Sequence, residues 1–137
     1  MNSPDKLLEK HSLRKTSLRL KVLTKFLDRP HAAVSTQNLE KSLADADRIS
    51  LYRTLKTFEK VGLIHKVMDG TQQNKYAICE ENCGDHRHDL DHAHFHCDMC
   101  KNTYCLEELG LDKISLPPQY TLHKANLALS GICANCK

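Results

Sequence analysis

Four cysteines in two CxxC pairs have the types and spacing of metal ligands. The first pair is Cys97 and Cys100, and the second is Cys133 and Cys136 near the end of the chain. Two such pairs supply the four thiolates of a closed tetrahedral zinc site, which stabilises a fold instead of performing chemistry. A redox role is disfavoured, because one CxxC would serve and neither pair follows a thioredoxin-like βαβ pattern. The sequence therefore predicts a structural zinc site.

A second group of nitrogen and sulfur donors surrounds the first pair. The stretch DLDHAHFHCDMC places His92 and His94 at alternate positions, so that both imidazoles share one face of an extended strand. Because four cysteines already fill the structural site, these histidines suggest a second metal site. Cys79 and Cys105 are the thiols that would complete a nitrogen and sulfur set suited to zinc. No role follows from the sequence for the further donors Cys83, His86, His88 and His123.

The seven cysteines of this 137-residue chain do not suggest a disulfide framework. The number is odd, and the sequence shows neither a secretory signal nor an apolar run long enough to span a bilayer. We therefore expect reduced thiols, a cytoplasmic protein and no membrane partner. The formal net charge is only +3, but residues 1–66 hold fourteen of the twenty Lys and Arg residues, a mild bias compatible with nucleic acid.

The first half of the chain has the pattern of helices followed by a hairpin. From Ser17 to Leu27 apolar residues recur three and four apart, which predicts an amphipathic helix. Ser35 is the expected N-cap of a second, short helix, and Gly62 is expected to end a third. The runs LIHKVM and NKYAIC then predict two strands joined by a turn at residues 69–73. This order of elements is typical of a winged helix.

The third predicted helix carries a basic face. At 100° per residue its apolar residues fall on one side and its basic residues on the other. In a winged helix the last helix enters the major groove of DNA and the wing contacts the backbone. The alternative is that the basic residues form only the solvated side of a packed helix. We expect double-stranded DNA as the partner, because the basic face is nearly free of acidic residues; it comprises Arg53, Lys56 and Lys60, opposite Leu51, Leu55 and Phe58.

The composition changes after Tyr76, where cysteines and histidines become frequent. Short β-like stretches follow in NTYCLEELGL and YTLHKANLALSGIC, and they predict a small second domain. The expected fold class is therefore α+β. An N-terminal winged helix-turn-helix DNA-binding domain, residues 1–83, precedes a small zinc-stabilised α/β domain, residues 84–137.

Three motifs in this order resemble the ferric uptake regulator family of metal-responsive bacterial repressors. ISLYRTLKTFEKVGLI is similar to the recognition-helix signature TVYRTLxxLxxxGLV, HAHFHCDMC to HxHxxCxxC, and LALSGICANC to LxxxGxCxxC. Near the N-terminus, RKTSLRLKVL is similar to RxTxQRxxVL, with Leu18 in place of glutamine and Arg19 kept. The resemblance extends from about Ser12 to Cys136.

This resemblance implies a homodimer that binds a palindromic operator when a regulatory metal fills a site at the hinge between the domains. Residues 84–137 would form the dimerisation domain. The four CxxC cysteines fall on the family's structural zinc site, and Tyr52 and Arg53 fall where the family touches DNA. The full set of expected DNA-binding residues is Arg19, Tyr52, Arg53, Lys56 and Lys60.

The resemblance also implies ligands for the hinge site. The two histidines of HxHxxC are His92 and His94, and zinc-sensing members add a cysteine and an acid that map onto Cys79 and His65. A glutamate of iron-type members corresponds to Cys105, an alternative ligand. Thiolate in place of carboxylate favours Zn²⁺ over Fe²⁺ or Mn²⁺. We therefore expect a zinc uptake regulator with one structural and one regulatory zinc site.

Other functions remain open at this point. The same fold could sense iron, manganese or peroxide, and a zinc-stabilised interaction module would do without DNA. A zinc-dependent enzyme would need three protein ligands, an open coordination position and a general base. No HExxH or HxE…PCxxC pattern is present, so we expect neither an enzyme nor a small-molecule substrate.

Overall fold

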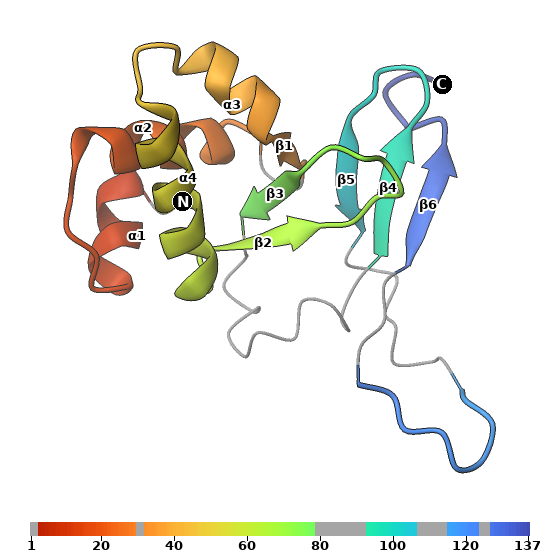
Figure 1. Cartoon of the computed structure of the whole chain (residues 1–137). Helices are drawn as coiled ribbons and strands as arrows, with labels where there is room; N and C mark the ends of the chain where they lie inside the picture. Colours follow the sequence, from red (N-terminus) through yellow and green to blue (C-terminus); the bar gives the residue numbers. More distant parts are fainter. Residues whose placement is uncertain (1–2, 30–31, 79–92, 107–114, 124–126) are drawn as a thin grey trace.

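The computed structural model describes residues 3–29, 32–78, 93–106, 115–123 and 127–137. Figure 1 shows a small sheet, β1-β3-β2, between the helices and a second sheet, β5-β4-β6. No helix in these ranges is both long and apolar enough to cross a bilayer. The helices are α1 Pro4–Lys10, α2 Ser17–Leu27, α3 Thr36–Ser42 and α4 Arg48–Lys60, and the strands are β1 Val34–Ser35, β2 Ile64–Val67, β3 Lys75–Ile78, β4 Ala93–Cys97, β5 Thr103–Leu106 and β6 Ala128–Gly131.

The three predicted helices are confirmed, and each begins at a side-chain cap. Thr16, Ser35 and Asp47 accept hydrogen bonds from backbone N–H groups in the first turns of α2, α3 and α4. Gly62 follows α4 with a φ of 83°, a left-handed conformation that glycine adopts without steric cost. α1 is an additional helix, too short for its buried leucines to make a recognisable period.

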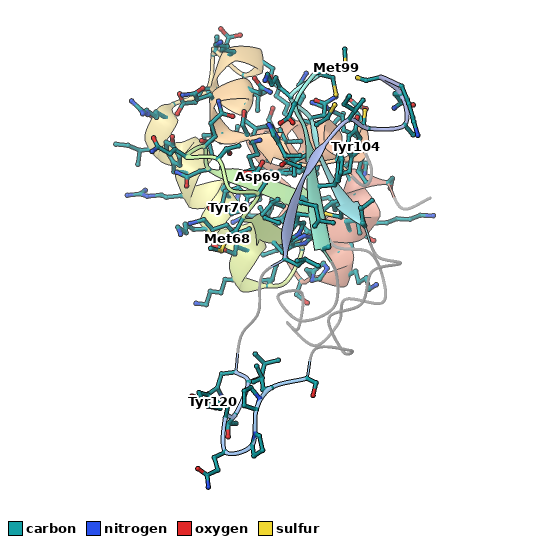
Figure 2. The ribbon with its side chains drawn as sticks, turned by 90° about the vertical axis from the view of Figure 1, so that its right-hand side faces the viewer. Met68, Asp69, Tyr76, Met99, Tyr104 and Tyr120 are labelled. Carbon is teal, nitrogen blue, oxygen red and sulfur yellow. The ribbon has the colours of Figure 1, made fainter. Side chains whose placement is uncertain are left out.

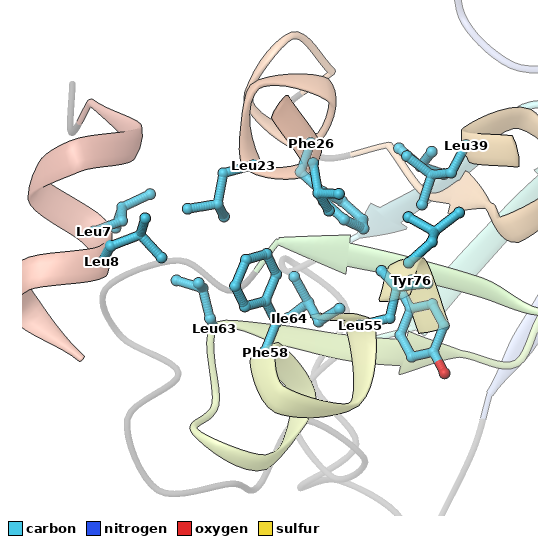
Figure 3. Packing of buried hydrophobic residues seen from close by; sticks show 13 residues of the cluster. Leu7, Leu8, Leu23, Phe26, Leu39, Leu55, Phe58, Leu63, Ile64 and Tyr76 are labelled. Carbon is cyan, nitrogen blue, oxygen red and sulfur yellow. The ribbon is translucent and has the colours of Figure 1, made fainter. Parts of the chain in front are cut away.

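The N-terminal core fixes the orientation of α4. Phe26 of α2 and Phe58 of α4 are fully buried, and leucines from the surrounding helices pack against them (Figure 3). Leu51 and Leu55 are each 1% exposed, which confirms the predicted apolar side of α4. Burying one such side chain is worth about 1.5–3 kcal/mol, so several together hold the opposite, basic side of α4 toward solvent.

The predicted hairpin is formed by β2 and β3. It is antiparallel, with His65 opposite Ala77 and Val67 opposite Lys75. Gly70 in the connecting turn has a φ of 86°. β1 extends the sheet on the far side of β3, which the sequence did not indicate because a strand of two residues has no detectable period.

The C-terminal sheet has β4 at its centre. β5 pairs with β4 in antiparallel fashion, so that His94 lies opposite Cys105 and His96 opposite Thr103. β6 pairs with β4 in parallel fashion. Residues 115–123 form a loop that extends away from both sheets, with Tyr120 on it (Figures 1 and 2). The predicted boundary between residues 83 and 84 lies outside the described residues and stays a prediction.

Backbone contacts join the C-terminal sheet to the N-terminal half. The N–H of Ala33 donates to the carbonyl of Thr103 at 2.7 Å, and Ala32 forms an antiparallel bridge with Tyr104. The Arg29 guanidinium also donates to the side-chain oxygen of Asn102. The hairpin of β4 and β5 is therefore held against the segment that leads into β1.

Candidate metal centres and the exposed basic helix

The four predicted zinc cysteines lie together at one end of the C-terminal sheet. Cys97 ends β4 and Cys100 follows in the turn, while Cys133 and Cys136 follow the adjacent strand β6. Their four sulfurs lie within 4.8 Å of one another, and those of Cys100 and Cys133 are 3.8 Å apart. Tetrahedral zinc with bonds of about 2.3 Å separates its sulfur ligands by about 3.8 Å. This four-cysteine cluster therefore fits a structural zinc ion.

Backbone hydrogen bonds prepare one thiol of the cluster for metal binding. The N–H groups of Cys100 and Cys133 donate to Cys97 Sγ at 3.5 and 3.4 Å. These bonds lower the pKa of Cys97 from its ordinary value to about 6. The thiolate is the form that binds a metal, so the turn geometry favours the ligand state of this residue.

A second cluster comprises His65, His94 and Cys105. One donor atom from each lies within 4.8 Å of the others, and His65 Nε2 is 3.7 Å from Cys105 Sγ. The two imidazole centroids are 5.8 Å apart, and both histidines are buried. We call this group the His–Cys cluster. Two imidazole nitrogens and a thiol are a donor set that fits zinc.

The His–Cys cluster is assembled from both sheets. His94 and Cys105 face each other across β4 and β5, whereas His65 comes from β2 in the N-terminal half. Cys105 also packs against a small apolar patch formed by Ala33, Val67 and Ala77. The contact between the sheets therefore brings the three donors together, with both histidines buried and Cys105 partly buried.

The structure places only some of the predicted regulatory ligands. His65 and His94 lie together as described, but Cys79 and His92 lie outside the described residues, as do Cys83, His86 and His88. Cys105, expected only as an alternative ligand, lies inside the cluster. The β4–β5 hairpin explains this, because it pairs residues at equal distances from its turn. His123 is exposed on the 115–123 loop.

A buried polar network adjoins the His–Cys cluster and was not predicted. Asp69 Oδ2 lies 2.6 Å from Lys75 Nζ and accepts a hydrogen bond from Thr103 Oγ1 at 2.5 Å. Burial raises the pKa of Asp69, but hydrogen bonds from Lys75, Thr103 and Thr71 outweigh it and hold the pKa well below the ordinary value. His96 Nδ1 is 3.0 Å from the Thr103 hydroxyl. The Asp-Gly pair in the sequence indicated only the turn.

The basic side of α4 is exposed. Arg53, Lys56 and Lys60 all face solvent, and Lys56 forms a 3.6 Å ion pair with Glu59. An exposed ion pair of this kind is worth well under about 1 kcal/mol, so it would not prevent contact with a phosphate. The helix presents exposed cations, and its contact with DNA stays a prediction.

Two other predicted DNA-binding residues have contacts within the chain. The Tyr52 hydroxyl donates to Glu40 Oε1 at 2.6 Å, and Arg48 Nε lies 3.3 Å from the same oxygen. Arg19 donates to the carbonyl of Arg14 at 2.8 Å, which ties the start of α2 to the preceding segment. Glu40 was not expected near α4, because it belongs to α3 and no sequence pattern links the two positions.

The fold, the paired cysteines and the basic helix agree with the comparison to known families. The model of the ferric uptake regulator family matches residues 10–132. The chain belongs to this family. Membership makes it a metal-responsive transcriptional regulator, not an enzyme, with an N-terminal DNA-binding region and a C-terminal dimerisation domain.

Individual relatives within the family are distant. The chain is 27% identical to the ferric uptake regulation protein of Staphylococcus aureus strain N315, over all of this chain and 99% of that protein. A zinc uptake regulator complexed with zinc and DNA has a TM-score of 0.65 at 23% identity, covering 96% of this chain and 89% of its own. The Vibrio cholerae ferric uptake regulator has a TM-score of 0.58 at 21% identity, covering 92% and 96%. Because regulators named for zinc and for iron share this fold, the fold does not identify the sensed metal.

Proposed function

We propose that this chain is a zinc-responsive repressor that binds a palindromic operator as a homodimer. The observation that supports zinc is the donor set of the His–Cys cluster, His65, His94 and Cys105. Thiolate and imidazole ligands suit zinc, whereas carboxylate oxygens suit manganese, and the described donors include no carboxylate. The four-cysteine cluster would hold a second, structural zinc.

A fourth ligand would complete tetrahedral coordination at the His–Cys cluster. Cys79 follows β3 directly, and His92 directly precedes β4. Cys79 is therefore next to the strand that pairs with β2, the strand of His65. His92 is two residues before His94. We propose one of these two residues as the fourth ligand.

The strands that carry the three donors suggest how a bound metal would change the arrangement of the two sheets. Zinc accepts lone pairs from all of its ligands at once. Because His65 comes from β2 while His94 and Cys105 come from β4 and β5, all three donors can share one ion only when the two sheets remain in contact. A ligand shifts a conformational balance by its different affinity for the two states, so the bound state would favour this contact.

The position of β2 links this contact to DNA recognition. β2 begins at Ile64, only a few residues after α4 ends at Lys60. Holding β2 against the C-terminal sheet therefore limits how α4 is oriented in each protomer. In a dimer this would set the spacing of the two α4 helices to half-sites about 34 Å apart. Arg19, Tyr52, Arg53, Lys56 and Lys60 are the proposed contacts.

The proposal is tested with a DNA site selected from a random library. Metal content per chain and operator affinity are measured as free Zn²⁺, Fe²⁺ and Mn²⁺ are varied, and the dimer is checked by sedimentation. We expect two zinc ions per chain and operator binding that rises as the second zinc binds. If operator affinity is independent of zinc but rises with the concentration of iron or manganese, zinc is not the sensed metal.

Iron sensing is the second candidate. It is favoured by the relative named as a ferric uptake regulation protein, which matches the whole of this chain. The two candidates differ at Cys105, since Fe²⁺ sensing would not need a thiolate there. The same titration separates them, because an iron sensor would reach full operator affinity with one zinc and one iron per chain.

A further inference from the structure

We propose that Asp69, Lys75 and Thr103 form a polar lock that positions His94 and Cys105 opposite His65 before the regulatory metal binds. The inference rests on the proposed function only in treating the His–Cys cluster as the sensing site. It adds a second, metal-independent part to the contact between the sheets.

On the C-terminal side, the lock residue Thr103 and the metal donor Cys105 lie on the same strand, β5. Thr103 is two residues before Cys105 on β5, and the paired residues on β4 are His96 and His94. Residues two apart on a strand share one face, at a separation of about 7 Å. The face that carries the donors therefore continues into the lock.

The N-terminal hairpin supplies the other side of both groups. His65 lies on β2, Asp69 follows two residues after β2 ends, and Lys75 begins β3. Val67 and Ala77 of the same hairpin belong, with Ala33, to the apolar patch against which Cys105 packs. The donor cluster, the apolar patch and the lock thus all contribute side chains to the contact between the sheets, and of these three only the donor cluster requires a metal.

Burial makes the lock sensitive to register. The side chains of Asp69 and Lys75 are 1% and 6% exposed, so water does not solvate their charges in this state. Asp69 Oδ2 is shared between Lys75 Nζ at 2.6 Å and Thr103 Oγ1 at 2.5 Å, and Lys75 Nζ also reaches Thr103 Oγ1 at 3.1 Å. A shift of β5 by one residue would withdraw the Thr103 hydroxyl from Asp69 and Lys75 and leave their buried charges less well satisfied.

The polar lock and metal binding must then affect each other equally. If the lock favours contact between the sheets, it raises the affinity of the His–Cys cluster for metal, and bound metal stabilises the lock by the same factor. Thr103 is a positioning residue in this scheme, because it touches Asp69 and Lys75 and acts on the metal donors through the sheet.

Amide hydrogen exchange of the intact protein tests whether the lock works without regulatory metal. The sample holds zinc in the four-cysteine cluster and none in the His–Cys cluster, as checked by one zinc per chain. The Ala33 amide donates to the backbone carbonyl of Thr103 on β5, so its protection reports contact between the N-terminal half and the C-terminal sheet. The Thr36 amide donates to Asn74 within the N-terminal half and serves as the internal control.

We expect both amides to be protected before zinc is added. If the Ala33 amide is unprotected in this sample and becomes protected only after zinc is added, the proposed lock is wrong. The proposed function would survive that outcome, since zinc would then bring the sheets together alone. Conversely, operator binding that does not respond to zinc would overturn the function without changing the exchange result, which needs no DNA.

Thr103→Val removes the hydroxyl and keeps the shape of the side chain. Zinc affinity of the His–Cys cluster, measured by competition with a chelator, should fall at least roughly tenfold, because the lost hydroxyl bonds both Asp69 and Lys75 and a single hydrogen bond to a charged group is worth about that much. Ala33 exchange should accelerate by a similar factor, and Thr103→Ser should restore both. Thr24→Val, which removes a hydroxyl from within α2, is the matched control. Unchanged zinc affinity and exchange in Thr103→Val would refute the proposal.

Discussion

The two cysteine-containing clusters differ in where their ligands come from. All four members of the four-cysteine cluster lie at the ends of β4 and β6 or just beyond them, within one sheet. The His–Cys cluster takes His94 and Cys105 from that sheet and His65 from the other. A site within one unit can only stabilise that unit, whereas a site between two units can also change how they are arranged.

The chemistry of the two clusters follows the same division. Four thiolates, one of them with its pKa lowered by backbone N–H groups, fit an ion that stays bound. The mixed donors of the His–Cys cluster suggest a regulatory metal ion. We therefore expect removal of a ligand to damage folding at the first cluster and regulation at the second.

The largest expected effect is at the four-cysteine cluster. Cys133→Ser should unfold the C-terminal sheet, because structural zinc contributes on the order of 10 kcal/mol of coupled folding energy. Zinc per chain and hydrogen exchange in β6 are the measurements. Ser130→Ala, an exposed change on the same strand, is the control. A folded C-terminal sheet with no bound zinc would remove the proposed difference between the clusters.

The next effect is at the His–Cys cluster. His94→Gln should leave a folded dimer with one zinc per chain but lower zinc-dependent operator affinity by about 100-fold, within the usual range of allosteric coupling. His123→Ala, at an exposed position, should behave as the unchanged protein. If His94→Gln instead lost the structural zinc, the assignment of residues to the two clusters would be wrong.

A smaller effect, on the order of tens of fold in zinc affinity, is expected for Cys105→Ser. The hydroxyl is a weaker zinc ligand than thiolate, so preference should also move away from zinc. Chelator competition with Zn²⁺ and Mn²⁺ measures both changes. Cys79→Ser is the informative comparison, because a loss of similar size would identify Cys79 as the fourth ligand. A Cys105→Ser protein with full zinc affinity would exclude this thiol from the site.

The smallest effect concerns a residue that belongs to neither cluster. Arg53→Ala should lower operator affinity by about tenfold and leave the zinc content at two per chain, since α4 lies outside both sites. Electrophoretic mobility shifts at several salt concentrations provide the measurement. Lys137→Ala, which also removes an exposed cation, is the control. Equal binding by Arg53→Ala and the control would show that this residue is not in the interface.

Local patterns in the sequence predicted much of the fold. The period of apolar residues in α2 and α4, and the caps Ser35 and Gly62, involve residues within a few positions of one another. The two CxxC pairs were recognisable for the same reason, because each pair is a local motif with the spacing of zinc ligands. These features depend on backbone geometry and short spacing, which a sequence displays directly.

The partners of His65 and Asp69 could be placed only in three dimensions. His65 is 40 residues from Cys105, and Asp69 is 34 residues from Thr103. These two contacts depend on the register of β4 with β5 and on the contact between the two sheets. Neither feature produces a periodic pattern in the sequence. The sequence by itself determined the family, the winged helix and the four-cysteine cluster. The tertiary structure decided that Cys105 joins the two histidines and that a buried ion pair adjoins them, because side chains from two separate sheets meet only once both have folded and packed.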